Sequence, residues 1–267
     1  MADQTRQTTA PAPAVPAVPA EPYEPDTRPD APNAFIPLEA NPPLMTELLH
    51  NLGVAPTLAV HDVFSLTEPD MLAFVPRPAM ALLLVFPISE AYEKHRVAED
   101  ADREVYTGHG SQEPVLWFRQ TIRNACGVMG LLHATANGPA RDFVGAGTPL
   151  DALLKRAVDL DPPARSRLLE TDKALAKAHH TAASGGATAA PDARDDIDLH
   201  YVCFVRTADG TLWELDGRRK GPISRGKLGA DDDVLSEKAL EWGPLAFLAR
   251  ESADLRFSCV ALGPSLD

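Results

Sequence analysis

The sequence predicts an α/β fold, with a mostly antiparallel central sheet and helices on both of its sides. Three stretches carry this prediction. Met80–Phe86 is apolar without alternation, as in a strand that is covered on both faces. Residues 200–217 alternate around Ala208-Asp209-Gly210 and indicate a β-hairpin. Val128–Leu132 is an apolar run too continuous for a surface helix.

Length and composition fit one globular domain with additional chain. The 267 residues contain 45% apolar and 24% charged residues, and no apolar run approaches the length of a membrane helix. The net charge of −13 disfavours nucleic acid and anionic membranes as partners and favours a basic partner. Three cysteines without ligand spacing indicate neither a disulfide framework nor a metal site.

Residues 1–33 are rich in proline and alanine, and a proline every two to four residues between Pro11 and Pro22 denies the segment helix and sheet. We therefore expect a disordered N-terminal arm, which is either a solubilising tail or a docking site. The remaining residues, 34–267, form the predicted domain. No apolar signal region opens the chain, so we expect a reducing cytosolic location, with the nucleus as a second one.

Periodicity and capping signals give the expected elements in chain order. Asn41 and Thr148 are predicted helix caps, and Gly53 is a predicted helix end. The charged helix at 91–102 is predicted to be solvated and without catalytic consequence. The expected helices are 42–52, 68–74, 91–102, one beginning at Cys126, 149–160, 162–178 and 236–251. The expected strands are 58–64, 80–86, the two of the hairpin, a short one after the basic loop 217–223, and 255–262.

Cys126 begins the most apolar of these helices, with Asn124 as its predicted N-cap. The free N–H groups and the dipole at a helix N-terminus stabilise an anion such as a thiolate. Gln120 precedes the helix and carries an amide donor that could reach the sulfur. Taken alone, Cys126 could equally be a small core residue and Gln120 a loop residue.

The hairpin supplies an imidazole and a carboxylate. If its turn has three residues, with Gly210 left-handed, Val202 pairs with Asp216, and His200 is the diagonal neighbour of Asp216 on the same face. A two-residue turn would put them on opposite faces. Cysteine, histidine and carboxylate, with a glutamine before the cysteine, form the constellation of papain-like nucleophilic catalysis.

Several segments in the right order resemble the ubiquitin carboxyl-terminal hydrolase family of cysteine peptidases, in its short single-domain form. The resemblance runs from about Phe35 to Leu262. The matching segments are Pro37–Pro42, Val75–Pro78, Phe86–Ile88, Gln120 with Asn124–Gly127, Asp198–His200, Trp213–Arg218 and Leu255–Phe257.

This resemblance implies a papain-like core and a thiol-dependent hydrolase of amide, ester or thioester bonds at the C-terminal glycine of ubiquitin. Cys126 would be the nucleophile, His200 the general base and acid, Asp216 the residue that orients His200, and Gln120 an oxyanion donor. Residues 178–197 would cross over the active site and favour small or unfolded leaving groups. No cofactor and no metal is implied, and the expected state is a monomer.

The resemblance also implies which residues contact ubiquitin, whose basic C-terminal region suits this acidic chain. They are Pro37, Leu38, Glu39, Ala40, Asn41, Pro42, Ser184, Gly185, Gly186, Ala187, Thr188, Ala189, Ala190, Asp254, Leu255, Arg256, Phe257, Ser258 and Cys259.

Two other function classes stay open. The chain could be a non-catalytic ubiquitin-binding module, or an unrelated Cys–His hydrolase of small amides. The remaining histidines are expected to have no catalytic part: His133 lies two turns beyond Cys126, and His179-His180 is expected on the surface of a loop.

Overall fold

A six-stranded sheet forms the centre of the molecule, and every strand pair in it is antiparallel. The computed structural model describes residues 34–185, 198–250 and 256–266. The strand order is β1-β6-β2-β3-β4-β5. The strands are β1 (Leu58–Asp62), β2 (Ala81–Pro87), β3 (Leu199–Arg206), β4 (Thr211–Leu215), β5 (Ile223–Lys227) and β6 (Ser258–Pro264).

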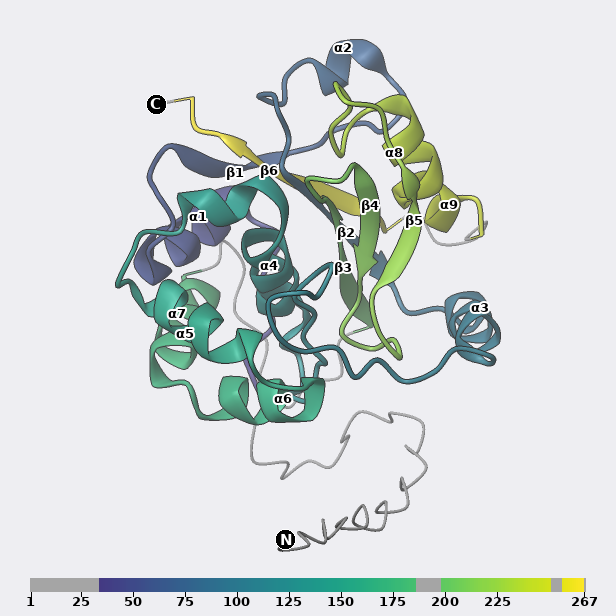
Figure 1. Cartoon of the computed structure of the whole chain (residues 1–267). Coiled ribbons are helices and arrows are strands. Elements are labelled where there is room, and N and C mark those ends of the chain that lie inside the picture. The colour runs from purple at the N-terminus through teal and green to yellow at the C-terminus, as the bar shows by residue number, and fades with distance from the viewer. Residues whose placement is uncertain (1–33, 186–197, 251–255, 267) are drawn as a thin grey trace, which may run out of the picture.

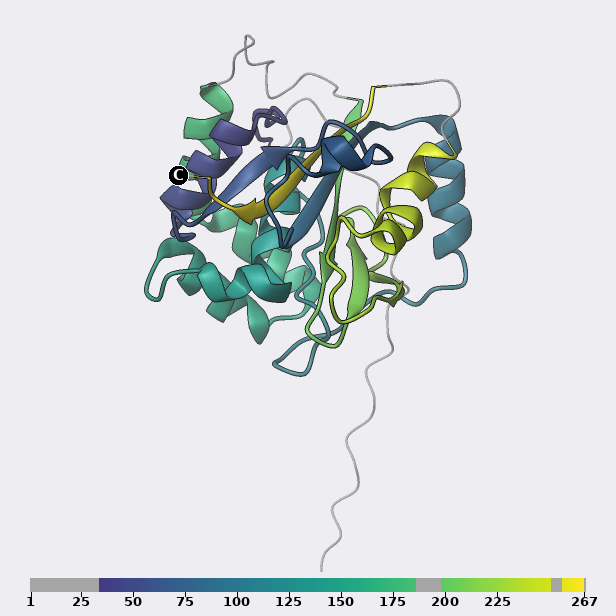
Figure 2. The same ribbon diagram turned by 90° about the horizontal axis from the view of Figure 1, so that it is seen from above.

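Helices cover both faces of this sheet, which confirms the predicted fold class (Figures 1 and 2). On one face lie α1 (Pro42–Leu52), α4 (Cys126–Ala136), α5 (Pro149–Val158), α6 (Pro162–Thr171) and α7 (Lys173–Ser184). On the other lie α3 (Glu90–Asp100), α8 (Glu237–Trp242) and α9 (Pro244–Leu248). A short helix, α2 (Pro69–Leu72), and a 3-10 helix, Gly138–Phe143, complete the set within the described residues.

Each face has its own hydrophobic core. Leu83 packs with α1 and α4 in one core, and its neighbour Leu84 packs with Phe247 of α9 in the other. All seven residues of β2 are buried because both of its faces are covered, which is why its sequence does not alternate. Among the described residues, no helix has the length and apolar character needed to span a membrane.

The predicted caps are present at the starts of α1 and α5. Asn41 Oδ1 accepts a hydrogen bond from the Leu44 N–H at 3.4 Å, and Thr148 Oγ1 accepts one from the Asp151 N–H at 3.3 Å. Gly53 ends α1 with a φ of 104°, a left-handed conformation that glycine adopts without steric cost. Local chemistry alone therefore sets these ends.

Two predicted helices are divided in the structure. The helix expected at 162–178 breaks at Asp172, whose extended backbone ends α6 and whose carboxylate caps α7 through the Leu175 N–H at 2.9 Å. The helix expected at 236–251 breaks at Gly243, because Pro244 has no N–H to continue the hydrogen-bond ladder and instead starts α9.

The length of α7 also corrects the expected extent of the segment 178–197, which was expected to be a loop crossing over the active site. Helix α7 continues to Ser184, so the first part of 178–197 is helical, and residues 186–197 lie outside the described part of the chain. His179 is therefore buried rather than on a loop surface: its Nε2 lies 2.8 Å from the Ile36 carbonyl oxygen, and its ring stacks on Phe35 with centroids 4.4 Å apart. His180 is exposed, as expected. The predicted N-terminal arm, 1–33, also lies outside the described residues.

Candidate active site

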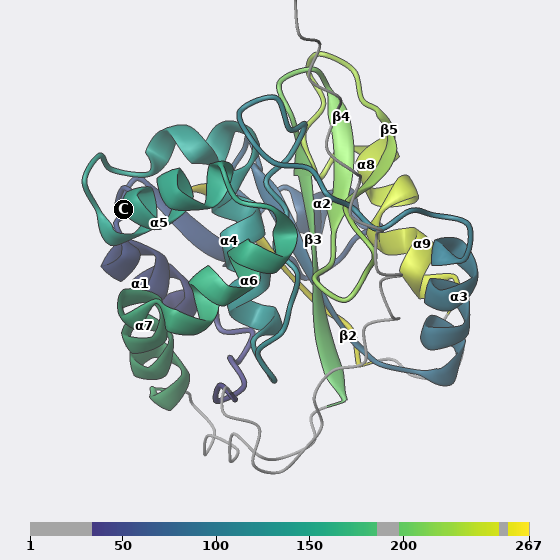
Figure 3. The same cartoon turned by 60° about the horizontal axis from the view of Figure 1, so that its bottom comes forward.

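Cys126 is the first residue of α4, at the end of the helix that faces the start of β3. Figure 3 shows this end of α4 beside the lower end of the sheet. The side chain is half-buried, and its Sγ lies 4.0 Å from the Leu199 carbonyl oxygen. The rest of α4, from Gly127 to Ala136, is buried, so the core holds the cysteine at a fixed height above the sheet.

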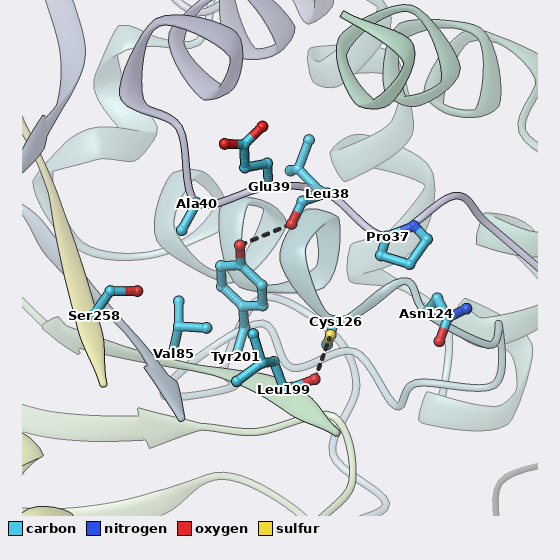
Figure 4. Close-up of a pocket in the computed structure, with 10 residues that line it drawn as sticks. All are labelled: Pro37, Leu38, Glu39, Ala40, Val85, Asn124, Cys126, Leu199, Tyr201 and Ser258. Carbon is cyan, nitrogen blue, oxygen red and sulfur yellow. Dashed lines mark hydrogen bonds between the residues drawn. The ribbon is translucent and has the colours of Figure 1, made fainter. Parts of the chain in front are cut away.

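The predicted cap of this helix is wrong. Ala125 occupies the N-cap position without a side-chain hydrogen bond, and Asn124 takes a left-handed backbone with a φ of 57°. Asparagine tolerates this conformation better than most residues. Asn124 therefore turns the chain sharply into α4, and its side chain lies at the rim of a pocket (Figure 4).

His200 and Asp216 lie on the same face of the hairpin, as the three-residue turn predicts. Cys203 pairs with Leu215, which sets Val202 opposite Asp216, and Gly210 has a φ of 85°. His200 Nε2 lies 2.7 Å from Asp216 Oδ1, and the two side chains are 2% and 1% exposed. The pair is therefore almost fully shielded from water.

Three further donors hold the Asp216 residue. The Tyr92 hydroxyl donates to Oδ2 at 2.7 Å, and the Arg218 N–H donates to Oδ1 at 2.8 Å. The Trp117 indole N–H donates to the Asp216 backbone carbonyl at 3.0 Å. Both carboxylate oxygens thus have donors, as buried charge requires.

These contacts set the protonation of the pair. Burial opposes the charge on His200, but the carboxylate of Asp216 and a hydrogen bond with Cys126 outweigh it and raise the pKa of His200 to about 9. Burial likewise opposes the charge on Asp216, but the imidazolium and the other donors to its carboxylate keep its pKa well below the usual range. The raised pKa of His200 favours its imidazolium form, the protonation state that a thiolate nucleophile needs.

Gln120 lies directly against the residue that follows Asp216. Its backbone N–H donates to the Gly217 carbonyl at 2.9 Å, and a Cβ on Gly217 would stand 2.8 Å from the Gln120 Cβ, so only glycine permits this approach. The side-chain Nε2 donates one hydrogen to the Ile122 carbonyl at 3.2 Å. An amide nitrogen has two hydrogens, which leaves one for an oxyanion.

A pocket of about 360 Å³ opens beside the sulfur (Figure 4). Its roof is the segment Pro37–Ala40, and Tyr201, whose hydroxyl donates to the Leu38 carbonyl at 2.9 Å, forms its floor. Gly127 makes room for both, because a Cβ there would stand 3.0 Å from the Leu38 Cβ. The pocket is lined by Pro37, Leu38, Glu39, Ala40, Val85, Asn124, Cys126, Leu199, Tyr201 and Ser258.

The structure brings together part of the predicted ubiquitin-contacting set. Residues 37–40 and Ser258 line the pocket, whereas Asn41 and Pro42 cap and begin α1. Ser184 and Gly185 are exposed at the end of α7, and Arg256 is exposed, forming an ion pair with Asp198 at 2.6 Å. Phe257 is half-buried, and the Cys259 side chain packs in the second core. Residues 186–190, 254 and 255 lie outside the described residues.

Sequence reasoning missed two buried side chains around the site. The first is Tyr92, which lies on the helix that was expected to have no catalytic consequence. The second is His133, which was expected to have no catalytic part and whose buried contact was not foreseen: its Nε2 accepts the Phe118 N–H at 3.0 Å, and burial lowers its pKa to about 4. The sequence did contain one signal for Tyr92: it is a lone tyrosine on a charged helix, three residues after the capping Ser89.

The described residues include no group of three or more side chains arranged to hold a metal ion.

Comparison with known proteins identifies the family of this chain. The family model "Ubiquitin carboxyl-terminal hydrolase, family 1" matches residues 35–242. A ubiquitin carboxyl-terminal hydrolase of Drosophila melanogaster is 38% identical over 226 residues, which cover 85% of this chain and 96% of that protein. Ubiquitin carboxyl-terminal hydrolase YUH1 of Saccharomyces cerevisiae is 33% identical over 243 residues, 87% of this chain and 97% of that protein.

A solved structure shares the fold. The UCH37 catalytic domain of Trichinella spiralis, bound to ubiquitin vinyl methyl ester, superposes with a TM-score of 0.66 at 20% identity, over 86% of this chain and 95% of that one.

Proposed function

The chain belongs to the ubiquitin carboxyl-terminal hydrolase family 1, and we therefore propose that it is a deubiquitinating cysteine peptidase that cleaves bonds at the C-terminal glycine of ubiquitin. The observation that carries the proposal is the buried His200–Asp216 pair beside a cysteine at a helix start, with a pocket opening at the sulfur.

In the first step of the proposed reaction, the imidazole of His200 takes the thiol proton of Cys126, which leaves a thiolate beside an imidazolium. The thiolate attacks the glycine carbonyl carbon, and the Gln120 amide and the Cys126 N–H donate to the oxyanion. Losing one such donor costs about 10²–10³ in rate in comparable enzymes. His200 then protonates the leaving amine or thiol. Water, deprotonated by His200, hydrolyses the thioester and restores the free cysteine.

Asp216 acts by holding His200 rather than by taking its proton. Its Oδ1 accepts from Nε2 at 2.7 Å, which leaves the other ring nitrogen, Nδ1, for exchange with Cys126. The His200 charge and the donors to the carboxylate outweigh burial and hold the pKa of Asp216 well below the usual range, so the carboxylate is charged when it faces the imidazolium.

Ubiquitin is the partner this site supports, and its tail would enter the pocket beside Cys126. We infer that the roof residues 37–40 and the segment Arg256–Ser258 contact it, and that the 184–190 segment, of which Ser184 and Gly185 are described and exposed, adds further contacts. Cys259 is not part of this surface, because its side chain packs in the second core. The net charge of −13 would speed the encounter more than it strengthens the complex. We further propose that 34–267 acts as a monomeric catalytic domain in the cytosol and nucleus.

Replacing the nucleophile tests the function. Cys126→Ala should abolish hydrolysis of a ubiquitin C-terminal amide and prevent labelling by an electrophilic ubiquitin probe, while it leaves ubiquitin binding and thermal unfolding unchanged. Cys203→Ala is the matched control, because Cys203 is buried in the core and burial raises the pKa of its thiol above the usual range. Probe labelling that survives Cys126→Ala would refute the assignment, and a non-catalytic module would not be labelled at all.

Leaving-group size gives a second test. We propose that the chain between the end of α7 and β3, residues 185–197, limits access to small or unfolded leaving groups. Inserting inert Gly-Ser residues into it should increase cleavage of folded ubiquitin conjugates relative to a small ubiquitin amide. An unchanged ratio would count against this gating.

A further inference from the structure

Tyr92 reaches the catalytic carboxylate from the face of the sheet opposite to Cys126. It lies in the first turn of α3 and is 4% exposed. Its hydroxyl donates to Asp216 Oδ2 at 2.7 Å, whereas the donors from His200 and Arg218 both go to Oδ1. Tyr92 is therefore the donor that the structure gives to the second oxygen.

We propose that Tyr92 is a positioning residue for the reaction, whose hydroxyl fixes the rotation of the Asp216 carboxylate so that Oδ1 stays aligned with His200. Without this donor, a buried carboxylate oxygen is left unsatisfied, and the carboxylate is held at Oδ1 alone, which leaves its rotation about the Cβ–Cγ bond less restricted. The inference rests on the proposed function, and it gives α3 a part in that function.

The hydroxyl itself is held rigidly. The Tyr92 N–H donates to the capping Ser89 Oγ at 2.9 Å, and its ring packs edge-on against Phe86 with centroids 4.8 Å apart. The Phe86 centroid also lies 5.8 Å from that of His200, so one aromatic ring braces both ends of the hydrogen-bonded chain. Burial and the Asp216 charge raise the pKa of Tyr92 well above its ordinary value, so the hydroxyl remains a donor.

Ion pairs hold α3 against the loop that follows Asp216. The Arg219 guanidinium, 1% exposed, bonds Asp100 at 2.9 Å and Glu99 at 2.7 Å near the far end of the helix. At the near end, Arg218 pairs with Glu93 at 2.8 Å. The charged side chains of α3 therefore fix the distance between Tyr92 and Asp216 instead of merely facing solvent.

The test is Tyr92→Phe, which keeps the ring and removes only the hydroxyl. We expect kcat on a ubiquitin C-terminal amide to fall by roughly 5- to 50-fold, the equivalent of one unsatisfied buried acceptor. KM should stay within about twofold, because Tyr92 does not line the pocket. The pKa of His200, measured by NMR, should fall, since its hydrogen bond with Asp216 weakens.

Two comparisons separate positioning from general stability. Tyr106→Phe removes a similar tyrosine–carboxylate bond, to Glu113 at 2.9 Å, and should change neither kcat nor the His200 pKa. In an Asp216→Asn background, Tyr92→Phe should have almost no further effect, because Tyr92 acts through Asp216. An unchanged kcat in Tyr92→Phe, or an equal loss in both backgrounds, would overturn the proposal.

A measurement without substitution at Tyr92 covers the case in which Tyr92→Phe unfolds. The Tyr92 hydroxyl proton should appear as a slowly exchanging, low-field signal in the wild-type protein and be lost in Asp216→Asn. Its absence from the wild-type protein would overturn the proposal. The His200 pKa and the hydroxyl signal need no ubiquitin, so they test the positioning role even if the ubiquitin amide proves not to be a substrate.

Discussion

Helices α4 and α3 approach the proposed catalytic residues from opposite faces of the sheet, and they are fixed there by different forces. In α4 every residue after Cys126 is buried, and apolar packing against β2 and β3 sets its place. In α3 only Tyr92 and Asp100 are buried, and ion pairs set its place. The apolar helix carries the proposed nucleophile itself, whereas we propose that the charged helix acts through the carboxylate of Asp216.

The polarity of a helix is therefore a poor guide to its distance from the chemistry. A buried helix is recognisable from its own sequence, because a continuous apolar run has to be covered by other parts of the protein. A charged helix has the same sequence whether its charges meet solvent or buried partners. Its part in the site depends on Arg218 and Arg219, which lie some 120 residues along the chain from α3.

The largest expected effect comes from removing the negative charge of Asp216, the residue that links the contacts of α3 to those of α4. Asp216→Asn should lower kcat by about 10⁴, as the equivalent loss does in serine peptidases, because the base loses its orientation and its compensating charge. Single-turnover hydrolysis of a ubiquitin amide measures it, with Cys126→Ala as the baseline. A loss below tenfold would mean that the two helices do not act on a common group.

The next largest effect should separate the forces that hold the helices. Arg219→Met removes the buried guanidinium that Asp100 shares with Glu99, and leaves Asp100 only Arg103 and the Lys220 N–H as partners. Breaking a buried pair outright typically costs about 3–5 kcal/mol in the free energy of unfolding, which is the upper bound expected here. Urea denaturation measures this. Arg156→Met is the matched control, because Arg156 is 62% exposed and its pair with Asp172 spans 3.8 Å, and it should cost less than about 1 kcal/mol. Similar losses in both variants would show that α3 is not held by its buried ion pair.

A smaller effect is expected from crowding the apolar helix. A Cβ at Gly130 would stand 3.0 Å from Leu83 Cδ2, so Gly130→Val should force α4 away from the sheet and cost about 1–3 kcal/mol in unfolding free energy. Ala98→Val adds methyl groups on the exposed side of α3 and should cost less than about 1 kcal/mol. Equal costs would mean that α4 is no more tightly packed than α3.

The smallest expected effect is a decrease in the free energy of unfolding as the pH falls. The pKa of Glu99 is lowered to about 2, because the hydrogen bonds and charges of Arg225 and Arg219 outweigh the opposing effect of burial, and that of Asp100 is lowered mainly by Arg219. Depressed carboxyl pKa values stabilise the fold above the unfolded value of about 4.3, and this contribution is lost as pH falls toward 2. Urea midpoints measured from pH 6 to pH 2 should fall more steeply in the wild-type protein than in Arg219→Met, and parallel slopes would contradict this.

Features that depend on a few neighbouring residues were predictable from sequence. Asn41 and Gly53 fix the ends of α1 by local hydrogen bonding, and the turn at Gly210 fixes the register that joins His200 to Asp216. The residues proposed for catalysis were therefore identifiable before any coordinates, through spacing and through resemblance to the family.

Features that depend on distant contacts were not predictable. Asn124 turns into α4 instead of capping it. His179 is drawn into the core by the carbonyl of Ile36, 143 residues away along the chain. Tyr92 and Asp216 are 124 residues apart, and no local pattern couples them. The positions of His179 and Tyr92 are each set by a hydrogen-bond partner on a distant segment of the chain. The periodicity of a single sequence carries no information about such a partner.

The register between β3 and β4 has one more consequence. Sixteen positions separate His200 from Asp216, and the even parity of that count keeps both side chains on one face. Deleting or inserting a single residue at the Ala208–Gly210 turn would make the count odd, and one of the two side chains would then point to the opposite face of the sheet. A two-residue change would keep the count even and could keep both side chains on one face. The length of a turn at the far end of the strands is thus as strict a requirement for activity as the identity of the residues that react.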